Sequence, residues 1–295
     1  MGSPVPLVEE VEKERPWYRK STGNNPGAGE PGRNADMAKL EFDDEGSRLV
    51  EAINTVPDTI ERRRAIMRTL NLKTGERVLD VGSGPGHQVL EMSPMVGPSG
   101  RVDGVDTSES MLRIARTRCE GVSNVEFHEG NALHLPFPDA TFDAVMSSMV
   151  FEYLPEVPGA LREVHRVLKP GGRVAIHGCA WGATLWRSSD PARMANMLAV
   201  WDNHLEDKAL PQTLNTRLRE SGFRQGDHAV YVMFNPVLNE NTYSHWLIEF
   251  VRAYNASQGV AEEEIDAWTD DLRRLGAAGD YFYSSNEYIM VGWKP

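Results

Sequence analysis

The feature that most limits the fold of this chain is a regular alternation of short apolar runs with helical patterns over residues 77–177. Strands that alternate with helices are typical of a parallel sheet, because each parallel connection must return to the starting end and commonly uses a helix. Helices then cover both faces of the sheet. The expected strands are residues 78–81, 101–105, 125–128, 142–147 and 173–177, and the clearest helices are 86–95, 108–120 and 156–168.

Beyond residue 178 the pattern changes to helices and two further strands. The expected helices are 188–205, 211–221, 242–255 and 262–275, and the expected strands are 229–234 and 288–293. The last two helices fall between the last two strands, so we expect cap helices at about 240–277, with ordinary packing helices as the alternative. A further helix is expected over 58–70, with Asp58 as its N-cap and Glu61 as the partner three residues on.

The first 36 residues are expected to form an arm apart from a single domain that covers residues 37–295. Residues 21–34 are rich in Gly, Pro and Asn and carry too little apolar surface to order themselves. Trp17 and Tyr18 directly precede this stretch. The arm is therefore either a flexible tail or a lid that lays an aromatic side chain over a ligand.

Charge and cysteine content disfavour several classes of protein. The chain of 295 residues carries a formal net charge of −12 without a Lys/Arg run, which is unfavourable for binding nucleic acid. Its two cysteines, Cys119 and Cys179, have neither zinc-type spacing nor the density of a disulfide scaffold, so we expect no metal and a reducing cytoplasm. We expect no membrane span and no secretory signal, because no apolar stretch approaches bilayer length and residues 1–20 lack an apolar core.

The segment VLDVGSGPG (78–86) carries the main functional signal. A strand runs into glycines at alternate positions and then into a helix, so backbone N–H groups can approach a ligand closely. A dinucleotide fingerprint, G-x-G-x-x-G, needs its third glycine where His87 stands, whereas this chain has Gly86. This spacing argues against a nicotinamide cofactor. Asp80, two residues before Gly82, can order the loop and help to hold a ligand's amino group.

Two polar residues follow the next strands where a nucleoside is held in such sheets. Asp106 lies about twenty residues after the glycine loop, where an acid can take both ribose hydroxyls. Asn131 follows the third strand and can bond an adenine edge, with Met111 and Leu133 as its apolar sandwich. Taken singly, Asp106 is equally well a helix cap and Asn131 a turn residue. Their order and spacing together favour a nucleoside site.

With these pieces in place, residues 77–176 resemble a class I S-adenosylmethionine-dependent methyltransferase of the small-molecule type related to the ubiquinone/menaquinone C-methyltransferases. The resemblance implies an α/β fold of the Rossmann-like, doubly wound type. Its sheet would be mostly parallel and seven-stranded, with an antiparallel last strand and a helical cap insertion. The matching pieces are VLDVGSGPG (78–86), VDGVD (102–106), EGNALHLPFPDATFDAV (129–145) and LREVHRVLKPGGRVAI (161–176).

The resemblance also implies S-adenosyl-L-methionine as the cofactor and assigns residues to it. The glycine loop would surround the methionyl part, Asp106 would hold the ribose, and Asn131 with Ala132 would meet the adenine. Ser147 would border the methionyl or sulfonium region. The full set of expected cofactor-binding residues is Asp80, Gly82, Ser83, Gly84, Gly86, Asp106, Thr107, Met111, Asn131, Ala132, Leu133 and Ser147.

Residues for catalysis and for the acceptor are less specific. Many relatives carry two histidines after the fourth strand, in a pattern like LHHL, whereas this chain reads FEYL at 151–154, so no histidine base is expected there. The candidate catalytic residues are His87, Glu152 and His177, with His134 also considered; each is equally a packing or surface residue. The aromatic candidates for the acceptor wall are Trp181, Trp186, Tyr243, Trp246 and Tyr283.

The expected function is transfer of a methyl group to a small-molecule acceptor at O, C, N or S. An aromatic, quinone-like or specialised metabolite is favoured. The N-P-P-Y-type motif of amide and adenine N-methyltransferases is absent where the chain reads SSMV at 147–150, which disfavours protein and nucleic-acid substrates. Two alternatives remain open, an NAD-dependent oxidoreductase on a Rossmann fold and a non-catalytic S-adenosylmethionine-binding protein. The oligomeric state is left open.

Overall fold

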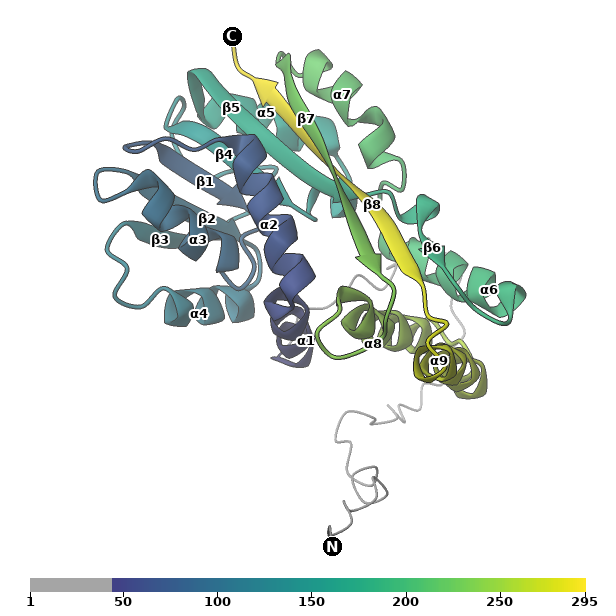
Figure 1. Cartoon of the computed structure of the whole chain (residues 1–295). Coiled ribbons are helices and arrows are strands. Elements are labelled where there is room, and N and C mark those ends of the chain that lie inside the picture. Colours follow the sequence, from purple (N-terminus) through teal and green to yellow (C-terminus); the bar gives the residue numbers. More distant parts are fainter. Residues whose placement is uncertain (1–43) are drawn as a thin grey trace, which may run out of the picture. The chain divides into compact units, whose positions relative to one another are not determined.

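The structure, a computed structural model, describes residues 44–295, and the predicted arm over residues 1–36 lies outside this part of the chain. The described residues build one eight-stranded sheet in the order β3-β2-β1-β4-β5-β8-β6, with β7 paired to β8 (Figure 1). The strands are β1 (Arg77–Val81), β2 (Arg101–Asp106), β3 (Val125–Glu129), β4 (Phe142–Ser148), β5 (Leu168–Cys179), β6 (Leu185–Trp186), β7 (Arg224–Asn235) and β8 (Tyr283–Trp293).

Strand direction follows the prediction. Strands β1 to β5 run parallel to one another, β8 is antiparallel to β5, and β7 is antiparallel to β8. The predicted Rossmann-like, doubly wound, mostly parallel sheet with an antiparallel last strand is therefore confirmed. The structure adds β6, which pairs with Tyr283 and Ser284 at the start of β8. A strand of two residues is too short to leave a periodic pattern in the sequence.

The helices alternate with the strands along the chain. None of the helices between residues 44 and 295 has the length and apolar character that crossing a bilayer requires. They are α1 (Asp44–Thr55), α2 (Pro57–Leu70), α3 (His87–Val96), α4 (Glu109–Arg118), α5 (Val157–Val167), α6 (Pro191–Trp201), α7 (Leu210–Glu220), α8 (Tyr243–Ser257) and α9 (Glu262–Ala277), with short 3-10 turns η1 (Phe151–Tyr153), η2 (Trp181–Ala183) and η3 (Asp202–His204).

Two apolar layers cover the sheet, one on each face. Side chains alternate across a strand, so Val78 joins the layer under α2 and α3, while its neighbour Leu79 joins the layer under α5 and α7. On β5, Ala175 and Val174 divide in the same way. Burial on both faces fixes the register, because a slip of one residue would exchange the two layers.

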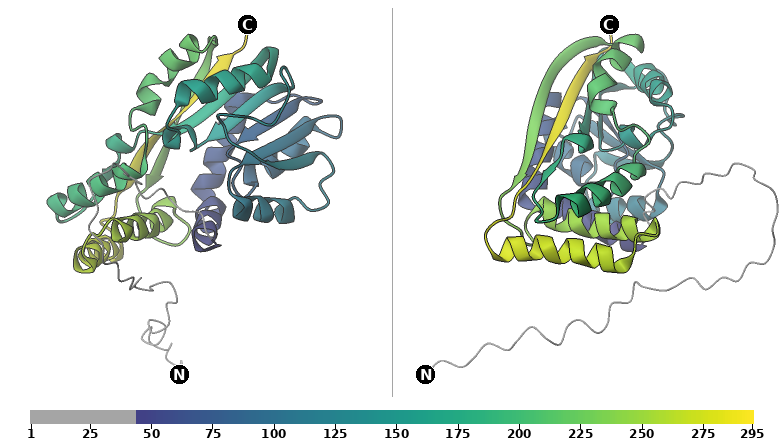
Figure 2. Two further views of the ribbon diagram at one scale, coloured as in Figure 1. Left: turned by 180° about the vertical axis from the view of Figure 1, so that it is seen from behind. Right: turned by 90° about the vertical axis from the view of Figure 1, so that its right-hand side faces the viewer.

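A third apolar cluster lies beyond the carboxyl end of β5 and joins α1, α6, α8 and α9 (Figures 1 and 2). The helices α8 and α9 occupy the connection between β7 and β8. Trp186, Trp268 and Tyr283 pack edge to face in this cluster, with ring centroids 4.9–5.5 Å apart. The role of these helices as a cap stays a prediction.

Two of the predicted helices have other ends in the structure. The helix expected to start at Asp58 instead starts at Pro57, which is favoured in the first turn because it has no N–H to donate. The Asp58 carboxylate accepts hydrogen bonds from Asn235 (2.6 Å) and from the backbone N–H of Tyr243 (3.0 Å), so it joins α2 to the β7–α8 segment. The helix expected over 188–205 is shorter, because Asp190 caps α6 and η3 tightens its end.

Candidate functional site

A cavity of about 570 Å³ opens at the carboxyl ends of β1, β2 and β4. This is the edge at which ligands bind in open α/β sheets. Residues directly beyond these strands line it, among them Gly82 after β1, Thr107 after β2 and Met149 after β4. Most of the expected cofactor residues meet here: Gly82, Ser83, Gly84, Asp106, Thr107, Met111, Asn131, Ala132 and Leu133.

The loop after β1 has a conformation that requires glycine. Gly82, Gly84 and Gly86 have φ values of 74°, 50° and 79°, in the left-handed region. A Cβ on Gly82 would lie 2.2 Å from a methyl carbon of Val150, and a Cβ on Gly86 would lie 2.8 Å from that of Ala115. A Cβ on Gly84 would meet nothing within 4 Å. Neighbouring side chains thus pack closely against the loop at Gly82 and Gly86, and not at Gly84.

Asp106 ties the second strand to this loop. Its carboxylate accepts a hydrogen bond from the backbone N–H of Gly84 (2.8 Å) and another from that of Ser108 (2.9 Å). Burial raises the pKa of Asp106, although these N–H groups and that of Thr107 oppose the shift. Ser108, and not Asp106, is the N-cap of α4. A carboxylate has room for further hydrogen bonds, so Asp106 can serve a ligand while it holds the loop.

Two polar side chains at the loop have no hydrogen-bond partner within the described part of the chain. Both carboxylate oxygens of Asp80 are buried and unpaired, and so is the hydroxyl oxygen of Ser83, which lines the cavity. Burial raises the pKa of Asp80 to about 8, and the charge of Asp106 adds to the shift. Buried polar atoms are rarely left unpaired in folded proteins. The Ser83 hydroxyl fits a ligand that brings a hydrogen-bonding group to the loop, and a cationic amino group nearby would stabilise the ionised form of Asp80, which does not line the cavity.

The part of the cavity wall that is expected to contact adenine includes a local turn. The side-chain oxygen of Asn131 accepts a hydrogen bond from the backbone N–H of Leu133 (2.9 Å), which is the turn arrangement considered as the alternative. Asn131 nevertheless lines the cavity together with Ala132, Leu133 and Met111. Backbone and apolar atoms are therefore what this side chiefly offers to a flat ring.

Three expected cofactor residues, Asp80, Gly86 and Ser147, do not line the cavity. Asp80 and Gly86 lie behind the loop that does. Ser147 is buried, and its hydroxyl donates to the carbonyl oxygen of Val81 (2.8 Å), so it joins β4 to β1.

His87 is the candidate base that lines the cavity. Its Nε2 lies 3.3 Å from the carboxylate of Glu51 on α1, and Arg118 bonds the same carboxylate. Burial and the charge of Arg118 lower the pKa of His87 to about 4, despite Glu51. The imidazole is therefore neutral at pH 7.

The other two candidates, Glu152 and His177, are buried behind the cavity wall. Burial raises the pKa of Glu152 to about 8, and neither of its carboxylate oxygens meets a partner at hydrogen-bond geometry among residues 44–295. His177 is bonded on both sides, by Ser148 at Nδ1 (2.9 Å) and by Glu287 at Nε2 (2.9 Å). Ser148 lines the cavity.

The side of the cavity away from the glycine loop is aromatic. Trp181 and Tyr243, both expected there, line it, whereas Trp186, Trp246 and Tyr283 do not. The imidazole of His204 stacks on Trp201, with ring centroids 3.8 Å apart. Their spacing of three residues at the end of α6 is the signal that would have placed them on one face. The lining residues missed from the sequence include Ser148 and, on this side, Tyr153, Trp201, His204, Leu247 and Phe250.

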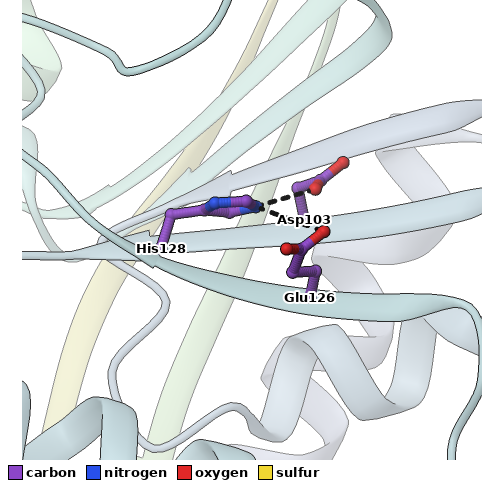
Figure 3. A group of neighbouring side chains, drawn as sticks. All are labelled: Asp103, Glu126 and His128. Carbon is purple, nitrogen blue, oxygen red and sulfur yellow. Dashed lines mark hydrogen bonds and ion pairs between the residues drawn. The ribbon is translucent and has the colours of Figure 1, made fainter.

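Asp103, Glu126 and His128, on β2 and β3, bring their donor atoms close enough to hold a metal ion (Figure 3). The two carboxylates of this group already form ion pairs with arginines. Arg77 lies 2.9 Å from Asp103, and Arg101 contacts both Asp103 and Glu126. None of the three lines the cavity. We therefore assign the group as an ion-pair network that joins the two strands.

Known proteins match the chain most clearly at its sheet. Residues 79–176 match the family described as "Methyltransferase domain". The demethylmenaquinone methyltransferase of Geobacillus stearothermophilus is 39% identical over 112 residues, which are 37% of this chain and 48% of that protein. The enzyme of the same name from Staphylococcus epidermidis is 38% identical over 112 residues, 38% of this chain and 46% of that protein. The chain thus spans about half the length of the curated relatives it matches.

Solved structures share the fold at low identity. The YcgJ protein of Bacillus subtilis has a TM-score of 0.56 at 21% identity, covering 80% of this chain and 98% of that one. Phosphoethanolamine N-methyltransferase 2 of Haemonchus contortus, solved with S-adenosyl-L-methionine, has a TM-score of 0.57 at 22% identity, covering 86% and 58%. The [4+2]-cyclase SpnF has a TM-score of 0.52 at 23% identity, covering 80% and 81%. Its name gives a different reaction, so the fold alone does not specify methyl transfer.

The matched segment coincides with the motifs that carry the resemblance. It begins in β1, directly before the glycine loop, and ends within β5. It therefore contains the loop, Asp106 and Asn131, which line one cavity. The predicted relationship to class I methyltransferases is confirmed. Residues 79–176 of this chain match a methyltransferase domain, lie on a Rossmann-like α/β fold and are similar in sequence to the demethylmenaquinone methyltransferases.

Proposed function

We propose that this protein transfers a methyl group from S-adenosyl-L-methionine to a small-molecule acceptor. The observation that carries the proposal is the loop after β1. There, left-handed glycines, the Asp106 carboxylate and the unpaired polar atoms of Asp80 and Ser83 gather at one cavity or directly behind it. The match of residues 79–176 to a methyltransferase domain supports the same reaction.

Each part of the cavity then has a task. The bound cofactor supplies an electrophilic methyl group on a sulfonium sulfur. Backbone around Gly82, Ser83 and Gly84 surrounds its methionyl part, Asp106 accepts hydrogen bonds from the ribose, and Ala132 packs against the adenine. Asp80 compensates the charge of the cofactor's amino group from the other side of the loop. Gly86 lets Ala115 of α4 pack against the loop. Positioning of this kind supplies up to roughly 7–11 kcal/mol of the barrier when two reactants are held in line.

The aromatic side of the cavity is where the acceptor binds. Trp181, Trp201 and Tyr243 offer large, flat apolar faces, which suit an aromatic, quinone-like or specialised metabolite. The attacked atom is O, C, N or S. Nucleic acid is not a partner in this proposal, because the chain carries a net charge of −12. We place the protein in the cytoplasm, where its two cysteines, both buried and free, remain reduced.

Two alternatives predict different ligands. An NAD-dependent oxidoreductase binds a nicotinamide dinucleotide, and a non-catalytic protein binds S-adenosylmethionine without turnover. Titration calorimetry with S-adenosylhomocysteine and with NAD, followed by a methyl-transfer assay against aromatic acceptors, separates the three. We expect micromolar binding of S-adenosylhomocysteine and none of NAD. The reverse pattern would refute the proposal.

Asp106→Ala is expected to weaken binding of S-adenosylhomocysteine at least tenfold, about 1.4 kcal/mol. The ribose loses its acceptor, and the N–H of Gly84 loses the oxygen that holds the loop. Titration calorimetry measures the affinity. Asp139→Ala is the matched control, since Asp139 is exposed and pairs with Arg166 away from the cavity. Unchanged affinity in Asp106→Ala would mean that the ribose lies elsewhere.

Residues 1–36 remain the proposed arm of this domain, as either a tail or a lid. A protein comprising residues 37–295 is expected to bind S-adenosylhomocysteine with unchanged affinity, because it keeps every described residue that lines the cavity, of which Val50 is the first. The lid proposal predicts that its turnover falls relative to the full chain. Equal turnover of the two proteins, compared at saturating cofactor, would leave the arm as a tail.

A further inference from the structure

The sheet face that packs against α2 becomes polar at its carboxyl end. Nearer the other end of the strands, this face is built from apolar residues of the layer under α2 and α3. Its last residues are Ser148 on β4, His177 on β5 and Glu287 on β8. Arg62 reaches them from α2. Buried polar groups cost stability unless they are well paired, so a run of them at a cavity calls for a physical explanation.

These side chains form a continuous chain of hydrogen bonds. Ser148 Oγ lies 2.9 Å from His177 Nδ1, and His177 Nε2 lies 2.9 Å from Glu287 Oε2. Arg62 lies 3.5 Å from the other oxygen of Glu287. An ionised carboxylate only accepts, so His177 carries its proton on Nε2. His177 Nδ1 then holds a lone pair, and the hydroxyl of Ser148 donates to it.

The charge state of the buried members favours this direction. Burial opposes ionisation of Glu287, but Arg62 and His177 outweigh it and lower the pKa of this carboxyl. Burial and the charge of Arg62 lower the pKa of His177, and they outweigh Glu287, which raises it. Glu152 also lies close enough to act on Glu287. The resting group is a carboxylate and a neutral imidazole.

Ser148 opens on the cavity at one end of this chain, and Arg62 lines the cavity at the other end. The side chain of Ser148 is half-buried and lines the wall, whereas His177 and Glu287 are fully buried. In the sheet, β4 stands between β1, which leads into the glycine loop, and β5, which leads to Trp181. Ser148 therefore lies between the proposed cofactor side and the proposed acceptor side.

We propose that Ser148, His177 and Glu287 form a proton relay that deprotonates an acceptor bearing an O–H or N–H group. This inference rests on the proposed function. As the acceptor heteroatom bonds the methyl carbon, the bond from that carbon to sulfur breaks and leaves its electron pair on sulfur. The acceptor proton passes to Ser148 Oγ while Ser148 gives its own proton to His177 Nδ1. The positive charge lost from sulfur ends on the imidazolium, which Glu287 stabilises.

The tautomer of His177 tests the relay without turnover. Imidazole nitrogen NMR of the full chain bound to S-adenosylhomocysteine is expected to show a neutral ring at pH 7 with its proton on Nε2. The His177→Gln spectrum assigns the signal. If that variant does not fold, the shift caused by Ser148→Ala assigns it instead. A proton on Nδ1 would overturn the relay, because Ser148 would then have to accept where it must donate.

Kinetics with catechol and 1,4-naphthohydroquinone as probes tests the step itself. General base catalysis contributes typically 10²–10⁴-fold, so Ser148→Ala is expected to lower kcat by about 100-fold. Its affinity for S-adenosylhomocysteine should stay within about twofold of the native value, a difference of about 0.4 kcal/mol. Ser148→Thr keeps a hydroxyl and is expected to retain most of the activity. Ser93→Ala is the matched control, since Ser93 is a buried serine on α3 that bonds Asn124 away from the cavity.

The outcomes separate this inference from the function on which it rests. Failure of the native protein to bind S-adenosylhomocysteine would overturn both. Binding with full turnover in Ser148→Ala would overturn the relay alone. Binding without transfer to either probe would also overturn the relay, because it would have no proton-bearing acceptor to serve.

Discussion

Gly82→Ala is expected to abolish cofactor binding at micromolar concentration, with an affinity loss of at least about 100-fold, or 2.7 kcal/mol. The new Cβ would lie 2.2 Å from a methyl carbon of Val150, and the residue would have to keep a φ of 74°. A left-handed conformation costs a residue with a Cβ about 1–2 kcal/mol, and overpacking typically costs 1–3 kcal/mol more. The loop must therefore move, and it takes its backbone N–H groups out of position. Titration calorimetry with S-adenosylhomocysteine measures the loss.

Two further variants separate the clash from the backbone strain. Gly121→Ala also places alanine at a positive φ (80°), but it meets nothing within 4 Å and lies outside the cavity wall, so it should lose stability without losing affinity. The double variant Gly82→Ala/Val150→Ala removes the opposing side chain and is expected to regain part of the affinity. A Gly82→Ala protein that binds as well as the native one would show that the loop does not contact the ligand.

Glu152→Gln is expected to stabilise the protein, and increasingly so as the pH rises from 5 to 8. Burial raises the pKa of Glu152 to about 8, so the folded protein holds a proton that the unfolded chain, with an ordinary glutamate pKa, has already released. Each pH unit in this window therefore removes up to about 1.4 kcal/mol of native stability. The stability that protonated Glu152 contributes is fully present below the pKa that Glu152 has in the unfolded chain. It is lost as the pH rises through the pKa that Glu152 has in the folded protein. Glutamine does not titrate, so the gap should reach the order of 3 kcal/mol by pH 8.

Chemical denaturation at a series of pH values measures this gap. Asp80, whose pKa is also raised to about 8, is present in both proteins, so its effect cancels in the comparison. Glu163→Gln is a control of opposite sign, because the hydrogen bond from Arg166 lowers the pKa of Glu163. That variant should be less stable than the native protein above the unfolded glutamate pKa. A gap between Glu152→Gln and the native protein that does not change with pH would show that Glu152 is ionised in the fold.

Sequence patterns predicted the strands, helices and turns that are determined by residues close together in the sequence. A strand such as β1 is a short, mostly apolar and buried run bounded by turns, and the loop after it is marked by glycines at alternate positions. β7 is longer than expected, because its polar first half, from Arg224, forms ladder pairs with β8 that are not visible in its own composition. Asp58 was placed wrongly as a cap because its partners, Asn235 and Tyr243, are distant in sequence.

The same distinction holds for the site. Asp106 and Asn131, which line the cavity, could be predicted because one ends a strand and the other follows one closely. The arrangement of Ser148, His177 and Glu287 had no such signal, because the antiparallel register of β8 brings Glu287 opposite Cys179 and thus beside His177. Trp201 and His204 come to the cavity only through the packing of α6 beyond the sheet. The cavity residues that the sequence did not reveal are therefore mostly those that tertiary structure brings together.

The position of α8 between β7 and β8 has a consequence for how this protein can be re-engineered. Tyr243, Leu247 and Phe250 of α8 form part of the aromatic wall, yet the helix belongs to a connection whose two ends are fixed by strand pairing. Side chains of α8 that face the cavity can therefore be exchanged without changing the loop after β1, whereas the residues that bury α8 in the third apolar cluster must be kept. Variants that methylate new acceptors should be sought first in libraries that vary α8 and leave the parallel strands β1 to β5 unchanged.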